Sequence, residues 1–402
     1  MAERSLAGQV SFELPSARRL RQALALFGAV LLAGCQTMVP KTQAPPPPPP
    51  VKPATPPPVT TLPTDTERHR IALLVPLTGA NAAVGQSIAN ATTMALLDTK
   101  TERLRVTTYD TGKDAAAAAR QAVAEGNKLI LGPLTGDEVK AVAPIARAAK
   151  VPVVSYSNDA SVAGNGVFLL GYAPTQSIDR VISYARSKGA KNFAALVPKG
   201  VYGERAGTAF LASVKSAGGT AVGMETFDRS AASVTAAVKR LATRSSYDAL
   251  LIADIGRIAV QIAPQVRSSE SGANAKLLGT ELWNTDSSIS TSAALRGAWF
   301  ASVSDGLYRT LASKYRTSYG TTPYRLASLG YDSVLLTVRI SQDWKPGSDF
   351  PMARLSDPDG FAGIDGAFRF GGSGLAERAL EIQQVDAGSI SVVDAAPRGF
   401  GK

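Results

Sequence analysis

The stretch IALLVPLTG at residues 71–79 and its counterpart FAALVPKG at residues 193–200 indicate the fold of this chain. Each begins with a short apolar run that ends in proline, and each leads through a glycine-bearing loop into an amphipathic helical stretch. Short apolar runs that alternate with amphipathic helices are typical of βαβ units, whose strands form a parallel sheet. Because the pattern restarts near residue 193, we predict two similar α/β lobes in succession.

The same alternation extends to either side of these two stretches. After residue 298 it gives way to two long helical stretches and a glycine-rich segment, 363–385, which is typical of a β-hairpin. The contiguous part of the first lobe offers too few strands to complete it, so we expect this tail to return there. The predicted strands are 71–75, 104–109, 128–131, 151–155, 193–198, 221–227, 249–253 and 276–278, and the predicted helices are 86–97, 114–125, 137–149, 206–217, 233–243, 257–267, 307–319 and 324–342.

The N-terminal 34 residues read as a targeting segment. Arginines at 18, 19 and 21 precede an apolar run, 23–33, that is too short for a stable membrane anchor. Leu32-Ala33-Gly34-Cys35 follows and resembles the lipobox of bacterial lipoproteins, which implies cleavage before Cys35 and acylation of that residue. Gln36 in the next position resembles the sorting pattern for the outer membrane. The alternative is a free cysteine at the end of an ordinary secretory peptide.

Residues 36–68 hold twelve of the 25 prolines and show no helix or strand periodicity. Such a segment prefers the extended polyproline II conformation, so we predict a semi-rigid spacer, with an SH3-type ligand as the alternative. The whole chain has a formal charge of +11, and loss of residues 1–34 would leave +9. Basic and acidic residues are interspersed and aromatic residues are 6%, so we expect an anionic cell envelope rather than nucleic acid to meet this charge.

The cysteine and histidine content of the chain excludes many classes of enzyme site. One cysteine and one histidine rule out an internal disulfide, a Cys/His zinc site and a CxxC pair, and any histidine-dependent triad has to use His69. We place His69 in a solvated position before the first strand. The chain lacks a P-loop, a dinucleotide fingerprint after a strand and a G-x-S-x-G elbow. We therefore predict no cofactor, no metal and no enzymatic activity.

The loops that follow the predicted strands carry a recognisable series of motifs. Loops at the carboxyl ends of strands are where open α/β sheets bind ligands. The series is Pro76-Leu77-Thr78-Gly79 with Gly85-Gln86, Gly132-Pro133-Leu134-Thr135-Gly136, Ser155-Tyr156-Ser157-Asn158-Asp159, Tyr202-Gly203-Glu204, Gly279-Thr280-Glu281, Gly330-Tyr331-Asp332, and 360–366 with Phe368 and Phe370.

Together these motifs resemble the type I periplasmic binding proteins of the leucine-binding group over residues 69–394. The resemblance implies two Rossmann-like lobes with parallel sheets, three crossovers between them and a small ligand in the cleft. The expected organisation is a signal peptide at 1–34, a linker at 35–68, a first lobe of 69–173 plus 303–372, a second lobe of 174–302 plus 373–394, and a tail at 395–402.

The resemblance also implies a ligand site. Helix N-termini would receive the carboxylate of an amino acid, and an acidic side chain would receive its ammonium group. The chain departs from the family pattern at Asp159, whose carboxylate would repel that of a ligand. The alternative for each site residue is turn or cap chemistry. The implied contacts are Thr135, Gly136, Ser157 and Asn158 from the first lobe, and Tyr202, Asp254 and Glu281 from the second, with Glu281 in the position of the family's acidic residue.

A second resemblance concerns the role in the cell. Outer-membrane lipoproteins that activate penicillin-binding proteins share this fold and a similar Pro-Leu-Thr/Ser-Gly opening, although they usually carry a helical-repeat domain, which we do not expect in this sequence. The lipobox and the proline-rich tether favour such an activator, lipid-anchored on the periplasmic side of the outer membrane, with a peptidoglycan synthase as partner. The alternative is the binding subunit of an ABC importer, with a permease as partner and an amino acid or muropeptide-like molecule as ligand.

Overall fold

The computed structural model describes residues 67–400, apart from residues 245 and 285. These residues belong to one compact unit, Thr64–Lys402. The predicted signal peptide, the lipidation site Cys35 and the linker up to residue 66 lie outside the described residues. Within the described part, no helix is both long and apolar enough to span a bilayer.

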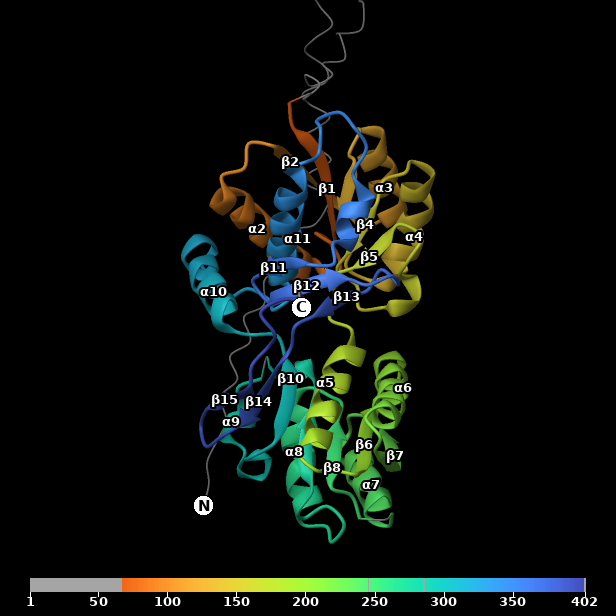
Figure 1. Cartoon of the computed structure of the whole chain (residues 1–402), viewed down its shortest axis with the longest axis vertical. Helices are drawn as coiled ribbons and strands as arrows, with labels where there is room; N and C mark the ends of the chain where they lie inside the picture. The colour runs from red at the N-terminus through yellow and green to blue at the C-terminus, as the bar shows by residue number, and fades with distance from the viewer. Residues whose placement is uncertain (1–66, 245, 285, 401–402) are drawn as a thin grey trace, which may run out of the picture. The chain divides into compact units, whose positions relative to one another are not determined.

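The first lobe is built on a five-stranded parallel sheet with the order β2-β1-β3-β4-β5. Successive side chains of β1 point to opposite faces, and both faces are buried, so the strand is apolar throughout. Ile71, Leu73 and Val75 pack with α2 and α11, whereas Ala72 and Leu74 pack with α3 and α4 (Figure 1). The elements are β1 (His69–Val75), α2 (Ala82–Thr99), β2 (Leu104–Asp110), α3 (Ala115–Ala124), β3 (Leu129–Leu131), α4 (Gly136–Ala148), β4 (Val153–Ser155), η1 (Ala160–Val162) and β5 (Val167–Leu169).

The second lobe has a seven-stranded sheet with the order β15-β14-β10-β9-β8-β6-β7. Its strands from β6 to β10 run parallel, and β14 and β15 add two antiparallel strands beside β10. The elements are α5 (Pro174–Ser187), β6 (Asn192–Pro198), α6 (Val201–Ser216), β7 (Thr220–Phe227), α7 (Ala231–Ala242), β8 (Ala249–Ile252), α8 (Gly256–Arg267), β9 (Lys276–Gly279), η2 (Glu281–Trp283), α9 (Ser288–Thr291), η3 (Ala293–Leu295), β10 (Trp299–Ser302), β14 (Glu381–Val385) and β15 (Ile390–Asp394). The predicted α/β class with two parallel sheets is confirmed.

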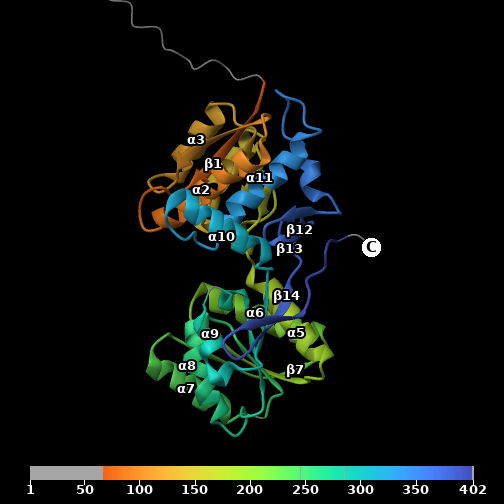
Figure 2. The same ribbon diagram turned by 90° about the vertical axis from the view of Figure 1, so that its left-hand side faces the viewer.

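After β10 the chain returns to the first lobe, as predicted. Helix α11 packs along α2, and α10 packs there through a cluster of Met94, Leu311 and Tyr315 (Figure 2). A small antiparallel sheet follows and places Phe361 and Phe368 in the core that β1 shares. These elements are α10 (Gly306–Tyr319), α11 (Ala327–Ser341), η4 (Met352–Ser356), β11 (Phe361–Gly363), β12 (Gly366–Phe370) and β13 (Ala376–Arg378).

The single hairpin expected over 363–385 is wrong in part. Strands β12 and β13 do form a hairpin, but β14 leaves it after Ala379 and Leu380 and pairs with β10 and β15 instead. The physical reason lies in the side chains of β14, because Ile382 and Val385 are buried in the core of the second lobe.

The solvated position expected for His69 is also wrong. Its side chain stacks on Trp344 with ring centroids 3.8 Å apart, and the residue is only 3% exposed. Burial lowers the pKa of the His69 imidazole, and nearby Arg103 acts in the same direction, although a backbone hydrogen bond involving Trp344 opposes them. His69 is thus part of the packing at the start of β1.

Candidate functional site

A cavity of about 330 Å³ lies where loops of both lobes meet the segments that connect them. Its walls are mostly apolar or aromatic, with a few polar groups among them, as is usual for sites that bind small molecules. The lining residues are Leu134, Tyr156, Asn158, Tyr172, Arg325 and Leu326 from the first-lobe side, and Glu281, Leu282, Asn284, Ser302 and Val303 from the other.

Two of the predicted contacts, Asn158 and Glu281, line this cavity. Glu281 follows β9 and accepts a hydrogen bond from the Ser177 hydroxyl of α5. Burial raises the pKa of Glu281, although hydrogen bonds from Ser177 and Tyr202 partly oppose the shift. A carboxyl group held in this way accepts hydrogen bonds well and takes up a proton more readily than an exposed glutamate does.

Tyr202, predicted as a ligand contact, lies beside Glu281 but is not among the lining residues of the cavity. Its hydroxyl is 3.2 Å from the Thr280 hydroxyl, and burial and the charge of Glu281 raise its pKa. Asp254 is fully buried, and both of its carboxylate oxygens accept from Nε of Arg229 at 3.0 Å. The hydrogen-bonding capacity of Asp254 is therefore used within the second lobe.

Thr135 and Gly136 form the start of α4. The Thr135 hydroxyl accepts from the Glu138 amide at 3.3 Å, and the Glu138 carboxylate in turn accepts from the Thr135 amide at 2.8 Å. This reciprocal pair is a capping box, which satisfies N–H groups that a helix start leaves free. The structure thus uses Thr135 in the cap chemistry that the sequence left open as its alternative role.

The chain's own Asp159 carboxylate lies at the N-terminus of α4. A Cβ atom added to Gly136 would be 2.6 Å from Oδ2 of Asp159. The Asp159 carboxylate also pairs at 2.6 Å with Arg205 of α6, so this ion pair joins the two lobes. Ser157 supports the turn by accepting from the Asp159 amide at 3.0 Å. Burial alone would raise the pKa of Asp159, but hydrogen bonds from Ser161 and Arg205 hold it below its usual value.

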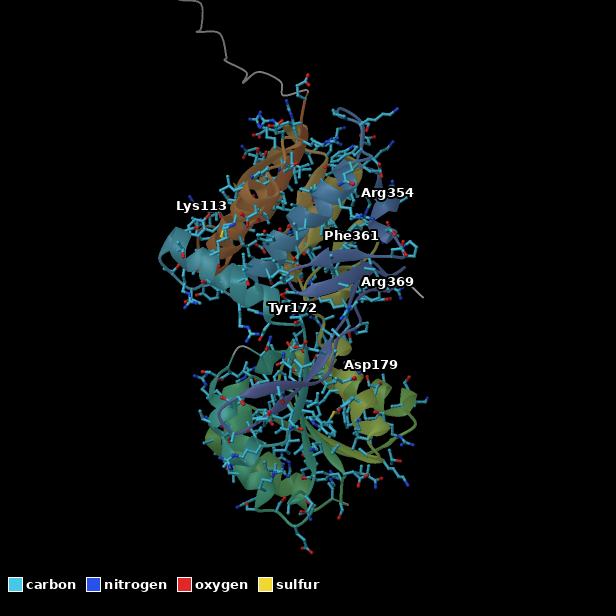
Figure 3. All side chains as sticks on the ribbon, turned by 60° about the vertical axis from the view of Figure 1, so that its left-hand side comes forward. Lys113, Tyr172, Asp179, Arg354, Phe361 and Arg369 are labelled. Carbon is cyan, nitrogen blue, oxygen red and sulfur yellow. The ribbon has the colours of Figure 1, made fainter. Side chains whose placement is uncertain are left out.

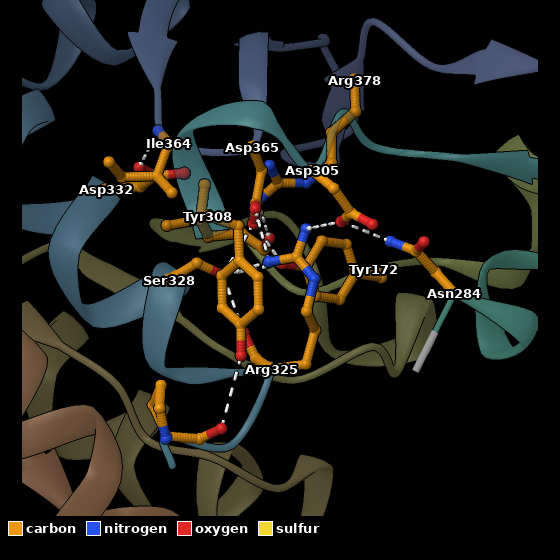
Figure 4. Close-up of polar contacts among 12 residues, drawn as sticks. Tyr172, Asn284, Asp305, Tyr308, Arg325, Ser328, Asp332, Ile364, Asp365 and Arg378 are labelled. Carbon is orange, nitrogen blue, oxygen red and sulfur yellow. Dashed lines mark hydrogen bonds and ion pairs between the residues drawn. The ribbon is translucent and has the colours of Figure 1, made fainter. Parts of the chain in front are cut away.

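A buried polar network, which the sequence did not reveal, gathers the three segments that connect the lobes (Figure 4). Asp365 is its centre and accepts from the Tyr172 hydroxyl, from Ser328 at 2.7 Å and from Nη1 of Arg325 at 2.6 Å. Tyr172 lies in the first connection, between β5 and α5 (Figure 3). Burial opposes ionisation of Asp365, but Arg325 and Arg378 lower its pKa below the usual value.

The other two connections join the same network. Asp305, between β10 and α10, lies 3.7 Å from Nη2 of Arg325 and accepts from the Asn284 amide at 2.8 Å. Arg378, at the end of β13, lies over the Tyr172 ring at 4.8 Å and donates to the Leu170 carbonyl at 2.7 Å. The sequence signal for the network was the glycine-rich 360–366 motif, which holds Asp365 but gives no sign of its partners.

Asp332 of α11 lies beside this network. It is fully buried and accepts from the Ile364 amide at 2.6 Å, while its second oxygen has no hydrogen-bond partner among the described residues. Burial, together with the charge of Asp365, raises the pKa of Asp332 to about 7.

The raised pKa of Asp332 makes the stability of the fold depend on pH in a defined direction. Between about pH 4, where an unfolded Asp titrates, and about pH 7, folded Asp332 holds a proton that the unfolded chain has lost, so its contribution to stability falls as pH rises. We expect the difference in unfolding free energy between the wild type and Asp332→Asn to fall over this range in urea titrations. The subtraction removes the titrating groups that do not interact with Asp332, and parallel pH curves would contradict the assignment.

The described residues contain no group of three or more His, Cys, Asp or Glu side chains placed to hold a metal ion.

A comparison with known families gives a match over residues 69–389 to the family described as periplasmic binding protein. This range includes both lobes. The chain belongs to the periplasmic binding protein family. Proteins of this family work in the periplasm as solute-binding or regulatory proteins, and the expected leucine-binding-type fold is confirmed.

Solved structures of this fold include transport proteins and a regulator. A putative branched-chain amino acid ABC transporter protein from Rhodospirillum rubrum is 20% identical, with a TM-score of 0.69 over 81% of this chain and 100% of its own. The C-domain of LpoA from Haemophilus influenzae, a regulator of PBP1A, is also 20% identical, with a TM-score of 0.64 over 81% of this chain and 99% of its own. At this identity the likeness concerns the fold.

A curated relative, an uncharacterized protein from Rickettsia prowazekii, is 34% identical over 137 residues. The match spans 33% of this chain and 36% of the relative, about a third of each.

Proposed function

We propose that this protein is a non-enzymatic binding protein that takes a small molecule into the cavity between its lobes. The observation that carries this proposal is the cavity itself, whose lining comes from both lobes and includes Asn158, Glu281 and Arg325. Its volume of about 330 Å³ is at the lower end of the usual range for ligand pockets, which favours a molecule of amino-acid size over a muropeptide. His69, the single histidine, is buried against Trp344 and is not among the lining residues.

Asn158 and Glu281 are the predicted residues best placed to contact the ligand. The Asn158 side chain is exposed and makes no hydrogen bond to a described residue, so its amide is free to donate and accept. Glu281 offers an acceptor for an ammonium or hydroxyl group, and Tyr202 helps to hold it. Thr135, Ser157 and Asp254 use their polar groups within the chain, so we do not assign them a ligand contact.

A ligand screen tests this proposal. We expect at least one small amino acid or carboxylic acid to raise the melting temperature of the purified protein, because a ligand at 100 times its Kd stabilises the folded state by about 2.7 kcal/mol. Glu281→Gln should weaken the binding of ligands that carry an ammonium group, and Arg354→Gln, on the surface, should not. A ligand whose binding is unaffected by Glu281→Gln would contradict the Glu281 contact. A screen in which no compound shifts the melting temperature would contradict the proposal.

In the cell, we propose that the protein acts on a peptidoglycan synthase from a lipid anchor at the outer membrane. Cys35 after a lipobox-like motif, the proline-rich spacer and a charge of +9 without the leader support this role. The Asp159–Arg205 ion pair supports this role as well, because it holds the two lobes together through the chain's own side chains. The surface that a partner would contact is then in place without a bound ligand.

The second candidate is the binding subunit of an ABC importer. The cavity favours it, since an importer has to distinguish loaded from empty binding protein, and this requires a ligand whose binding shifts the arrangement of the lobes.

Fractionation with crosslinking separates the two roles. We expect the protein in the outer membrane, crosslinked to a peptidoglycan synthase, and we expect Cys35→Ala to yield an unprocessed or soluble product. Cys35→Ser, which also lacks the thiol, is the matched variant for Cys35→Ala and should give the same product. Inner-membrane residence with a permease crosslink would favour the importer, and an unmodified Cys35 in the membrane form would remove the lipid anchor.

A further inference from the structure

The cavity contains one positively charged lining residue, Arg325, and the arrangement around it bears on the chemistry of the ligand. Its guanidinium group lies over the Tyr308 ring at 4.0 Å, and its Nη1 donates to Asp365 at 2.6 Å. The side chain is 13% exposed, so the guanidinium is largely shielded from solvent. These contacts fix the plane and the direction of the guanidinium group before any ligand arrives.

One edge of this guanidinium has no acceptor. Nη2 of Arg325 is buried without a hydrogen-bond partner, because Asp305 at 3.7 Å is too distant, and Nε makes no hydrogen bond to a described residue. Nε and Nη2 form the side edge of the group, which matches the two oxygens of a carboxylate. A buried donor that lacks an acceptor is costly, so this edge favours a ligand that supplies one.

The charges near this guanidinium come from Arg325 and Arg378 and from the carboxylates of Asp365 and Asp305. Asp365 is bound closely by Arg325, and Arg378 lies near both, so two guanidinium groups share this carboxylate. Burial and the charge of Asp365 raise the pKa of Asp332, which favours the neutral form of this carboxyl group. Asp305 offsets part of the positive charge, and Asn284 binds one of its oxygens.

The alternative anion site in the fold is already filled. The Asp159 carboxylate lies against Gly136 at the start of α4 and pairs with Arg205. A ligand carboxylate placed there would meet a like charge, which is unfavourable in a partly buried site.

We propose that the ligand of this cavity is a small carboxylate whose anionic group binds the Nε–Nη2 edge of Arg325. The proposal rests on the proposed function, since it assumes that the cavity takes a ligand. It places the anionic group of the ligand at Arg325, just before α11, rather than at the start of α4. Glu281 is then free to accept a hydrogen bond from a donor group elsewhere on the same ligand.

The test compares acids with their matched amides by calorimetric titration of the purified full chain. The pairs are hexanoate and hexanamide, benzoate and benzamide, and leucine and leucinamide. We expect at least one acid to bind and its amide to bind about tenfold to a hundredfold more weakly, because the amide loses the charge-assisted pair. Equal binding of an acid and its amide would overturn the Arg325 assignment and leave the proposed function intact, whereas no binding of any member would overturn both.

Two variants locate the contact. Arg325→Lys keeps a positive charge beside Asp365 but lacks the planar edge, and we expect it to weaken acid binding at least tenfold while the melting temperature confirms that it folds. Arg354→Gln changes an exposed arginine that is not among the lining residues, and it should leave acid binding unchanged. The reverse result would overturn the proposal, as would a crystal structure of the wild-type protein with the acid's oxygens at Gly136 instead of Arg325, and this last readout holds even if Arg325→Lys fails to fold.

Discussion

Asp365→Asn is expected to lower the free energy of unfolding by about 3–5 kcal/mol, the usual cost of removing one partner from a buried ion pair. Asp365 is fully buried and binds Arg325, Ser328 and Tyr172 at once. Asparagine keeps the size of the side chain but removes the carboxylate that binds Arg325 most closely and that Arg378 also faces, and only the more distant Asp305 then remains beside Arg325. Urea titration at neutral pH measures the loss.

The matched control is Asp349→Asn. Asp349 also pairs with a basic residue, Lys128 at 2.8 Å, but its side chain is 70% exposed. Exposed ion pairs contribute little, so we expect the unfolding midpoint of this variant to stay close to that of the wild type. If both variants lost the same amount of stability, the network would not be the structural centre of the three connections.

Gly203→Ala is expected to destabilise the protein by about 1–3 kcal/mol or more, the usual cost of overpacking a close contact. An added Cβ at Gly203 would lie 1.5 Å from the Pro198 carbonyl oxygen, so α6 has to move away from the end of β6. Intrinsic helix propensity acts in the opposite direction, since alanine is favoured over glycine by about 1 kcal/mol inside a helix. A net loss therefore isolates the steric contact.

Gly372→Ala serves as the control for this prediction, because an added Cβ there would meet no atom within 4 Å. Thermal or urea unfolding compares the two variants. A Gly203→Ala protein as stable as the Gly372→Ala protein would show that the chain relaxes around the close contact. The first lobe repeats the geometry, because a Cβ added at Gly85 of α2 would lie 1.8 Å from the Pro76 carbonyl oxygen, so Gly85→Ala should behave like Gly203→Ala.

The sequence predicted the repeated strand–loop–helix unit because both copies follow local rules. An apolar run closed by proline, with a glycine nearby in the next helix, has the same local consequences at Pro76 and at Pro198. A helix follows each run, although α2 and α6 begin four and five residues before the predicted starts at 86 and 206. The return of the tail to the first lobe also followed, since a short strand set has to be completed by later segments. The position of His69 was missed because its burial depends on Trp344, far away in sequence.

The residues of the candidate site also divide into those that the sequence placed and those that only the structure showed. Asn158 and Glu281 lie where loop position placed them, at the cavity, and Tyr202 lies beside Glu281. Asp159 was recognised as a departure from the family pattern, but its partner Arg205 in the other lobe was not visible from the sequence. Arg325 was missed because it falls within a predicted helical stretch, 324–342, where an arginine normally faces solvent.

By itself, the sequence determined the α/β class, the two-lobe repeat and the loops that face the site, because these depend on periodicity and on the backbone limits of proline and glycine. The tertiary structure alone decided which charges meet. Asp159 with Arg205, and Asp365 with Arg325 and Arg378, come from segments far apart in the chain. Their pairing depends on burial and direction in three dimensions, since a buried charge is stable only beside its counter-charge, and no local pattern encodes that partner.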